Sequence, residues 1–188
     1  MAKLTEDFMQ TVQDYLKTNK KGLALIGMMG VGKSEVGKVL SEKMSLPFYE
    51  ADEMIVQRAG KPIPEIFKQD GEPHFRQLEC DVMQDTLKEP CILSAGGGAY
   101  IQQNTRAVLD GRAVVVWLYE DPKTVYDRIS GDPERPLLTT FEEYDALLST
   151  REPVYAKAAV HVDCAGASVE EVAQKVLLKT AERLKLQL

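Results

Sequence analysis

One stretch near the start of the chain constrains its fold more than any other. Residues 27–34 read Gly-Met-Met-Gly-Val-Gly-Lys-Ser, which fits the pattern G-x-x-x-x-G-K-S. In this pattern the glycines let consecutive backbone N–H groups turn toward phosphate oxygens. Lys33 can reach the outer phosphates, and the Ser34 hydroxyl can bind Mg²⁺. The stretch therefore predicts a phosphate-binding loop (P-loop) rather than a Gly-rich turn that binds nothing.

The sequence on both sides of this loop supports the prediction. Residues 22–26 form a short apolar run, which is typical of a buried parallel strand. After the loop, Val36, Val39, Leu40 and Met44 recur at the spacing of one helix face. The N-terminus of that helix would lie under the phosphates, where its dipole favours negative charge.

The rest of the chain alternates between strand-like and helix-like segments. We expect further strands at residues 47–50, 91–94, 113–118 and 160–163. We expect helices at residues 53–59, 62–67, 72–88, 102–109, 122–129 and 144–158, with a break near Pro153, and a final helix from Ser168. This alternation predicts an α/β fold: a three-layer P-loop fold with a five-stranded parallel sheet flanked by helices.

The positions of the polar and Gly-rich segments indicate where ligands would bind. In open parallel sheets, ligands bind beyond the carboxyl ends of the strands. The P-loop, Asp52 and the triple glycine at residues 96–98 all follow predicted strands, so we expect them on one rim of the sheet. Residues 130–140 contain Gly and Pro without periodicity and predict an irregular loop.

The chain divides into a short extension and one larger unit. Phe8, Val12 and Leu16 fall on one helical face, so residues 1–21 predict an amphipathic helical extension. We see no linker or repeat after it, and we expect residues 22–188 to form a single domain.

Charge and cysteine usage exclude several classes of partner. The net charge of −6 disfavours binding to nucleic acid or to an anionic membrane. No apolar run approaches the roughly 20 residues that span a bilayer, and acidic residues near the N-terminus argue against a signal or transit peptide. The three cysteines, Cys80, Cys91 and Cys164, lie far apart, so we expect reduced thiols in a cytoplasmic protein. We also expect a monomer.

A series of motifs follows the P-loop in a characteristic order. They are Glu50-Ala51-Asp52, Asp70-Gly71-Glu72 continuing through Phe75-Arg76 to Glu79, the glycines 96–98, Arg135-Pro136-Leu137-Leu138, and Arg151 ahead of Tyr155. With these motifs the chain resembles the shikimate kinases, a family of small P-loop kinases, from about residue 22 to its C-terminus. The resemblance implies Mg²⁺-dependent transfer of a phosphoryl group from ATP to the 3-hydroxyl of shikimate, in aromatic amino-acid biosynthesis.

The resemblance also implies roles for particular residues on the acceptor side. Asp52 would bind the shikimate hydroxyls and act as the base. Arg76 and Arg151 would bind the carboxylate, a task that suits the planar guanidinium fork. Gly97 and Gly98 would let the backbone approach the substrate closely.

On the nucleotide side the implied residues lie in the P-loop and around the irregular loop. Lys33 and Arg135 would join Asp52 as catalytic residues, with Arg135 on a lid at residues 130–140 that closes over ATP. The metal would bind Ser34. The nucleotide-binding set that we predict is Gly30, Val31, Gly32, Lys33, Ser34, Glu35, Arg128, which the family places against adenine, and Arg135.

The residues by themselves leave other interpretations open. Asp52 could be a plain helix cap, and Arg76 and Arg151 could be solvated surface residues. Glu79, one helical turn after Arg76, could hold that arginine in place or form an ordinary surface pair with it.

One position departs from the family pattern. Glu50 stands where the family has the first Asp of D-x-D, which supports the Mg²⁺ shell. The longer side chain either keeps this role with a shifted water or loses it. Two other functions stay open beside shikimate kinase: a P-loop kinase for another small hydroxy acid such as gluconate, and a nucleotide-binding module without catalysis.

Overall fold

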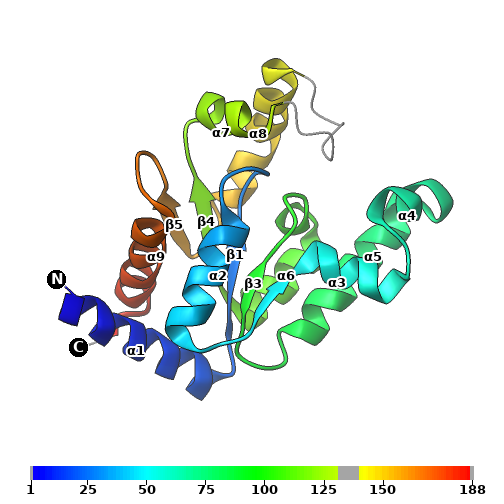
Figure 1. Ribbon diagram of the computed structural model, residues 1–188. Coiled ribbons are helices and arrows are strands. Elements are labelled where there is room, and N and C mark those ends of the chain that lie inside the picture. The colour runs from blue at the N-terminus through cyan, green and yellow to red at the C-terminus, as the bar shows by residue number, and fades with distance from the viewer. Residues whose placement is uncertain (1, 131–139, 187–188) are drawn as a thin grey trace.

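A parallel β-sheet forms the centre of the molecule, whose computed structural model describes residues 2–130 and 140–186, with side chains from residue 8 onward. In this part of the chain the sheet has five strands in the order β2-β3-β1-β4-β5 (Figure 1). They are β1 (Gly22–Ile26), β2 (Phe48–Glu50), β3 (Ile92–Ser94), β4 (Ala113–Tyr119) and β5 (Val160–Asp163). The prediction of a five-stranded parallel sheet is therefore confirmed.

The register of the sheet explains why the P-loop strand is apolar throughout. β1 lies between β3 and β4, with Leu23 opposite both Ile92 and Val114. All five residues of β1 are buried, as expected for a central strand that is covered on both faces.

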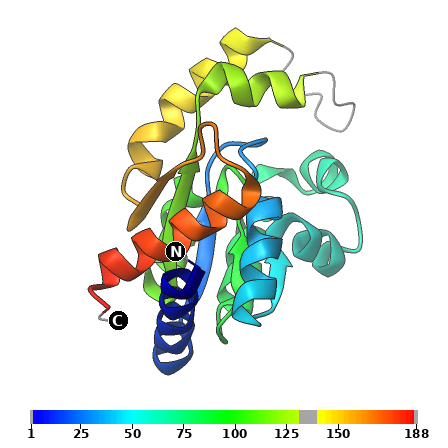
Figure 2. The same cartoon turned by 60° about the vertical axis from the view of Figure 1, so that its left-hand side comes forward.

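Helices cover both faces of the sheet and make the three layers (Figure 2). One face is covered by α1 (Ala2–Asn19), α2 (Lys33–Met44) and α9 (Val169–Leu184), which contact one another. The other face carries α5 (Gly71–Thr86), α6 (Gln103–Arg112), α8 (Phe141–Tyr155) and a short 3₁₀ turn, η1 (Ala99–Ile101), that follows β3. No helix within the described residues is long and apolar enough to cross a membrane.

Two further helices form an arm beyond the end of β2, at the right of Figure 1. They are α3 (Ala51–Ala59) and α4 (Ile63–Gln69), and both pack on α5. A separate small apolar cluster holds this arm together, with Ile55, Ile66, Phe75 and Val82 buried at its centre. The arm thus has its own packing, apart from the main core.

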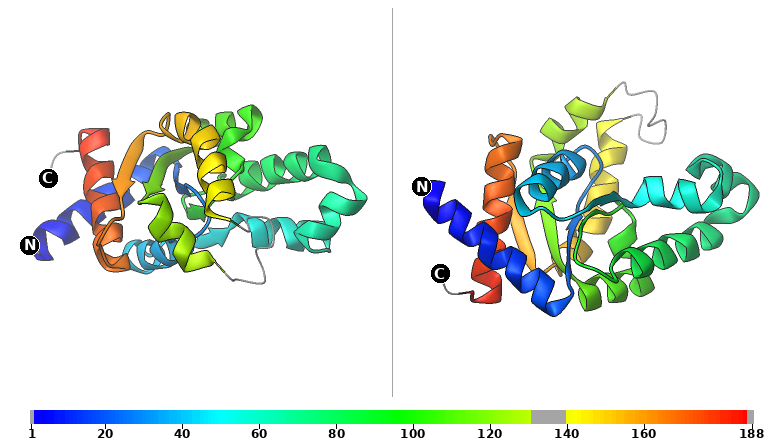
Figure 3. Two further views of the ribbon diagram at one scale, coloured as in Figure 1. Left: turned by 90° about the horizontal axis from the view of Figure 1, so that it is seen from above. Right: turned by 60° about the horizontal axis from the view of Figure 1, so that its bottom comes forward.

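The helix predicted before β1 is present and is docked on the domain. Val12 and Leu16 on α1 are fully buried in the main core cluster. The Gln13 side chain donates a hydrogen bond to the Met44 carbonyl at the end of α2. Figure 3 shows α1 crossing α9 on the underside of the molecule.

Several helix boundaries differ from the sequence expectation by one to three residues, and the starts of α3 and α8 bear on the site. α3 begins at Ala51, two residues earlier than predicted, so Asp52 lies in its first turn rather than before it. α8 begins at Phe141 because Thr140 and Glu143 form a reciprocal capping box. The predicted break at Pro153 is wrong: the proline lies inside the helix, which ends two residues later at Tyr155.

The predicted lid lies between α7 (Pro122–Ile129) and α8. Residues 131–139, which include Arg135, are outside the described part of the chain. An aromatic group joins the two flanking helices, because the Tyr126 ring meets the rings of Phe141 and Tyr144 at centroid distances of 5.8 and 6.0 Å.

Candidate active site

The P-loop connects β1 to α2 and contains two positions where the backbone requires glycine. Gly30 has φ +85°, and a Cβ there would lie 2.5 Å from Ile129 Cγ2 on α7. Gly32 has φ +96° and is the N-cap of α2. Both positions therefore favour glycine for the left-handed backbone, and Gly30 also for space. The helix that starts at Lys33 directs its free N–H groups toward the loop.

Lys33 spans the loop that it follows. Its Nζ donates to the carbonyl oxygens of Gly27 at 3.0 Å and Met28 at 2.9 Å. The ammonium group thus lies over the segment where a phosphate chain would bind. Glu35, in the first turn of α2, is exposed and pairs with Lys38 at 3.4 Å.

The triple glycine after β3 is the point where three predicted acceptor residues converge. A Cβ on the first glycine would lie 3.0 Å from Asp52 Oδ1, on the second 3.1 Å from Arg151 Nη1, and on the third 3.0 Å from both terminal nitrogens of Arg76. These side chains come from α3, α8 and α5. The glycines are therefore the floor on which a carboxylate and two guanidinium groups come together.

Glu79 is part of this cluster and not a surface residue. The residue is 1% exposed, and one carboxylate oxygen accepts from Arg76 Nη1 at 3.0 Å. Burial raises the pKa of Glu79, while Arg76 lowers it and the charge of Asp52 raises it again. Of the two interpretations left open by the sequence, the structure supports a carboxylate that holds Arg76 in place.

Arg76 receives a second anchor from its own helix. Glu72, one turn before it, accepts from its guanidinium at 3.1 and 3.2 Å. With a side chain only 22% exposed, Arg76 is held between two carboxylates and its fork faces the glycines. The alternative of a freely solvated arginine is wrong here.

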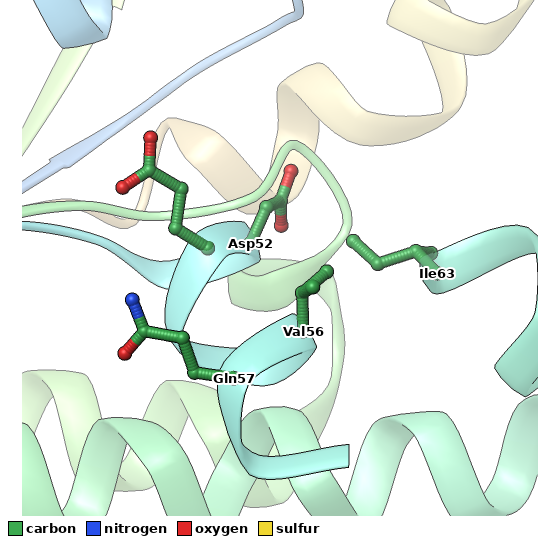
Figure 4. A pocket seen from close by; sticks show the side chains of 5 residues that line it. Asp52, Val56, Gln57 and Ile63 are labelled. Carbon is green, nitrogen blue, oxygen red and sulfur yellow. The ribbon is translucent and has the colours of Figure 1, made fainter. Parts of the chain in front are cut away.

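An open pocket of about 400 Å³ adjoins Asp52 (Figure 4). Its lining residues come from α3 and the start of α4, and they are Asp52, Glu53, Val56, Gln57 and Ile63. Figure 4 shows Val56 and Ile63 facing one another beside Asp52. The pocket thus joins two carboxylates to an apolar wall, which suits a small molecule that carries both hydroxyl groups and a carbon ring.

The helix α8 connects the acceptor cluster to the P-loop, a role that sequence reasoning missed. Arg151 Nη1 lies 3.8 Å from the Met28 sulfur. The Tyr155 hydroxyl donates to the Gly97 carbonyl and lies 3.9 Å from the same sulfur. Arg151 and Tyr155 are four residues apart, which places them on one helix face. This spacing of four residues was the only sign in the sequence that the two side chains could act together.

The residues near the end of β2 fit a metal ion. Glu50 Oε1 is buried and has no hydrogen-bond partner among the described residues. Phe48, on the same strand face, packs so closely on α2 that a Cβ on Gly37 would lie 2.4 Å from its ring. Glu50 therefore faces α2, whose first turn contains Ser34. Because no three acidic, His or Cys side chains cluster in the described chain, a cation here would also need phosphate oxygens.

Arg128 is held away from the acceptor cluster. Its guanidinium makes two bonds, of 2.6 and 2.8 Å, to the Glu120 carboxylate, whose side chain is nearly buried. This fork-to-fork pair fixes the guanidinium of Arg128, which comes from the last turn of α7, against Glu120, which directly follows β4. Glu120 was not predicted, because eight residues of separation carry no local signal.

Similarity to known proteins is consistent across sequence and structure. The shikimate kinase family model matches residues 29–181. The chain belongs to the shikimate kinase family. A shikimate kinase from Cereibacter sphaeroides is 40% identical over 168 residues, covering 87% of this chain and 84% of that protein.

Solved structures agree with this family assignment. A shikimate kinase from Acinetobacter baumannii in complex with shikimate has a TM-score of 0.83 and 31% identity, over 93% of this chain and 99% of that one. A gluconokinase from Sinorhizobium meliloti has a TM-score of 0.60 at 21% identity, over 88% of this chain and 96% of that one. The second likeness is one of fold alone.

Proposed function

We propose that this chain transfers the γ-phosphoryl group of ATP to the 3-hydroxyl of shikimate. The observation that carries the proposal is the convergence of Asp52, Arg76 and Arg151 on the glycines 96–98, one strand away from the P-loop. Membership of the shikimate kinase family supports it. A hydroxy acid needs both a cationic fork for its carboxylate and an acceptor for its hydroxyl proton, and this cluster offers both.

Each residue of the cluster then has a chemical task. Arg76 and Arg151 bind the substrate carboxylate with parallel N–H donors. Asp52 accepts the proton of the attacking hydroxyl as the new O–P bond forms. Gly97 and Gly98 leave room for the guanidinium groups beside the substrate. Phosphoryl transfer then depends on positioning and charge neutralisation rather than on a covalent enzyme intermediate.

The P-loop supplies the opposing half of the site. The backbone of Gly30, Val31, Gly32, Lys33, Ser34 and Glu35 would cradle the phosphates. Lys33 would exchange its carbonyl partners for phosphate oxygens. Its ammonium group would then neutralise the negative charge that develops on the leaving ADP.

Mg²⁺ would be held by Ser34, with Glu50 beside it. The unpartnered Glu50 oxygen supports a role for this longer acid despite its departure from the family pattern. When bound, the ion would supply positive charge that offsets the negative charge of the phosphates.

Several finer expectations are part of the same proposal. Arg128 would lie against the adenine, and Arg135 would reach the phosphates from a lid at residues 130–140. Lid closure would exclude water that otherwise competes with the hydroxyl. We further propose a cytoplasmic monomer in which α1 is an extension of a single domain of residues 22–188.

A coupled ADP-release assay with three acceptor conditions tests the function. With shikimate we expect turnover; with gluconate, or with no acceptor, we expect background rates only. Turnover with gluconate alone would identify a different hydroxy-acid kinase. ADP release that no acceptor increases would leave a nucleotide-binding module without the transferase activity.

Two substitutions separate the two halves of the site. Lys33→Ala should reduce kcat by about 10²-fold or more, because the phosphates lose a charged donor. Arg151→Ala should raise the KM for shikimate by at least about tenfold while the KM for ATP changes little. Steady-state kinetics with each substrate varied in turn would measure both, and an unchanged shikimate KM would remove Arg151 from the carboxylate site.

A further inference from the structure

We propose that Tyr155 is a positioning residue for the shikimate carboxylate, acting through Arg151. The inference rests on the proposed function, because it needs Arg151 to bind the substrate acid. Tyr155 itself would touch neither substrate. Its hydroxyl would fix the direction of the Arg151 fork and the position of the Gly97 backbone at the same time.

The two acceptor arginines are held in different ways. Arg76 lies between two carboxylates, Glu72 and Glu79. Arg151 forms no such ion pair within the described chain. Its Nη1 lies 3.8 Å from the Met28 sulfur and beside the Tyr155 hydroxyl, and its charge also acts on Glu79 and Tyr144. A long side chain without an anchor has many rotamers, and ordering it on binding weakens the affinity. Arg151 therefore depends on Tyr155 to keep its side chain in one orientation, whereas the two carboxylates do this for Arg76.

The Tyr155 ring is buried and lies next to an aromatic ring of the sheet. The residue is fully buried, and its ring lies 6.0 Å from that of Trp117 on β4. Burial raises the pKa of the Tyr155 hydroxyl, and the neighbouring Arg151 lowers it. The hydroxyl therefore keeps its proton near neutral pH and donates to the Gly97 carbonyl. Its oxygen and Arg151 Nη1 lie close to the same two points: 3.8 and 3.1 Å from the Cβ position of Gly97, and 3.9 and 3.8 Å from the Met28 sulfur. One buried group thus joins the glycine floor to the cation above it.

A matched pair of tyrosines on α8 tests this role. Tyr144, also buried, donates to the P-loop carbonyl of Met29 at 3.4 Å, whereas the Tyr155 hydroxyl donates to Gly97, the glycine nearest Arg151. Tyr155→Phe should raise the KM for shikimate about five- to tenfold, because the buried hydrogen bond to Gly97 and the polar group beside Arg151 are both lost. Its KM for ATP should stay within about twofold of wild type. Tyr144→Phe should leave the shikimate KM within about twofold.

A double variant distinguishes positioning from a general loss of packing. If Tyr155 acts through Arg151, adding Tyr155→Phe to Arg151→Ala should raise the shikimate KM no further. Additive effects would overturn the proposal. So would equal increases in shikimate KM for the two Phe variants, or an increase in both KM values for Tyr155→Phe.

The role of Tyr155 can be tested separately from the proposed function. Shikimate turnover by the wild type decides the function first. Calorimetric titration with shikimate alone then measures the affinities of the wild type and both Phe variants without catalysis. A selective loss of affinity in Tyr155→Phe supports the proposal, and an unchanged affinity overturns it.

Discussion

At the scale of single residues, the proposed acceptor site depends on the absence of side chains at three glycines, residues 96–98. Each of the three glycines after β3 leaves the space of one Cβ, and a different functional side chain comes close to each space. None of the three has a positive φ, so alanine could adopt the backbone at these positions. Their role is one of space rather than of turn geometry.

Gly98→Ala tests that distinction. The added methyl group would lie 3.0 Å from Arg76 Nη1 and Nη2, so the flexible end of the arginine must move while the fold can stay unchanged. We expect the KM for shikimate to rise about tenfold, as for a lost charged hydrogen bond, with little change in the ATP KM or in thermal stability. A large fall in stability with an unchanged shikimate KM would contradict this view.

The buried Glu79 predicts a particular dependence of stability on pH. Its pKa is raised above the ordinary value of 4.5, chiefly by burial. Above that value the unfolded chain loses the proton before the folded chain does. The contribution of this group to stability is therefore full below pH 4.5 and is lost as pH rises toward the folded pKa.

Glu79→Gln isolates this contribution. Because the amide does not ionise, the stability of the variant relative to wild type should increase from pH 4.5 upward. Urea unfolding of both proteins across that range measures the difference. The same variant should bind shikimate more weakly, since Arg76 loses one charged anchor. A stability difference that is flat with pH would contradict the assigned pKa direction.

Sequence reasoning proposed Asp52, Arg76 and Arg151 as site residues because they belong to motifs with recognisable spacing, and the structure brings the three side chains together at glycines 96–98. It could not decide whether Glu79 is buried, since an i,i+3 pair with Arg76 is compatible with both surface and interior. Burial of that pair depends on how α5 packs against the glycines, and this is set by contacts far apart in sequence. The Tyr155 contacts with Gly97 and Met28 were hidden for the same reason.

At the scale of elements, the strands were predicted well and the helix ends less well. β1 and β5 match their predicted bounds because each is a short β-branched or apolar run between polar segments. The prediction of a break at Pro153 was wrong because proline removes one intrahelical hydrogen bond without preventing the last turn of α8. The start of α8 was missed because Thr140, which forms its capping box, was assigned to the loop predicted at residues 130–140.

The N-terminal helix α1 gives a prediction about stability alone. Leu16 is fully buried in the main core, on the face of the sheet away from the acceptor cluster. Leu16→Ala should lower the free energy of unfolding by about 2–4 kcal/mol and leave both KM values unchanged. The exposed neighbour Lys17 provides the control, with an expected change within about 0.5 kcal/mol for alanine. A Leu16→Ala effect as small as that of the control would show that α1 is not integral to the core.

At the scale of the whole molecule, parallel strand order brings the two half-sites together. β1 leads into the P-loop, and its neighbour β3 leads into glycines 96–98, so the proposed nucleotide and shikimate sites lie at adjacent strand ends. The helix α8 then touches both half-sites, through Met29 on one side and Gly97 on the other. The sequence predicted the shared rim, but not the strand order or the bridging helix.

The most direct test of this account is a crystal structure with ADP and shikimate bound together. The account predicts that the shikimate carboxylate contacts both Arg76 and Arg151, and that one hydroxyl lies about 3 Å from Asp52 on the side that faces the P-loop. A shikimate carboxylate bound away from both arginines, or an Asp52 that faces away from the hydroxyl nearest the nucleotide, would contradict it.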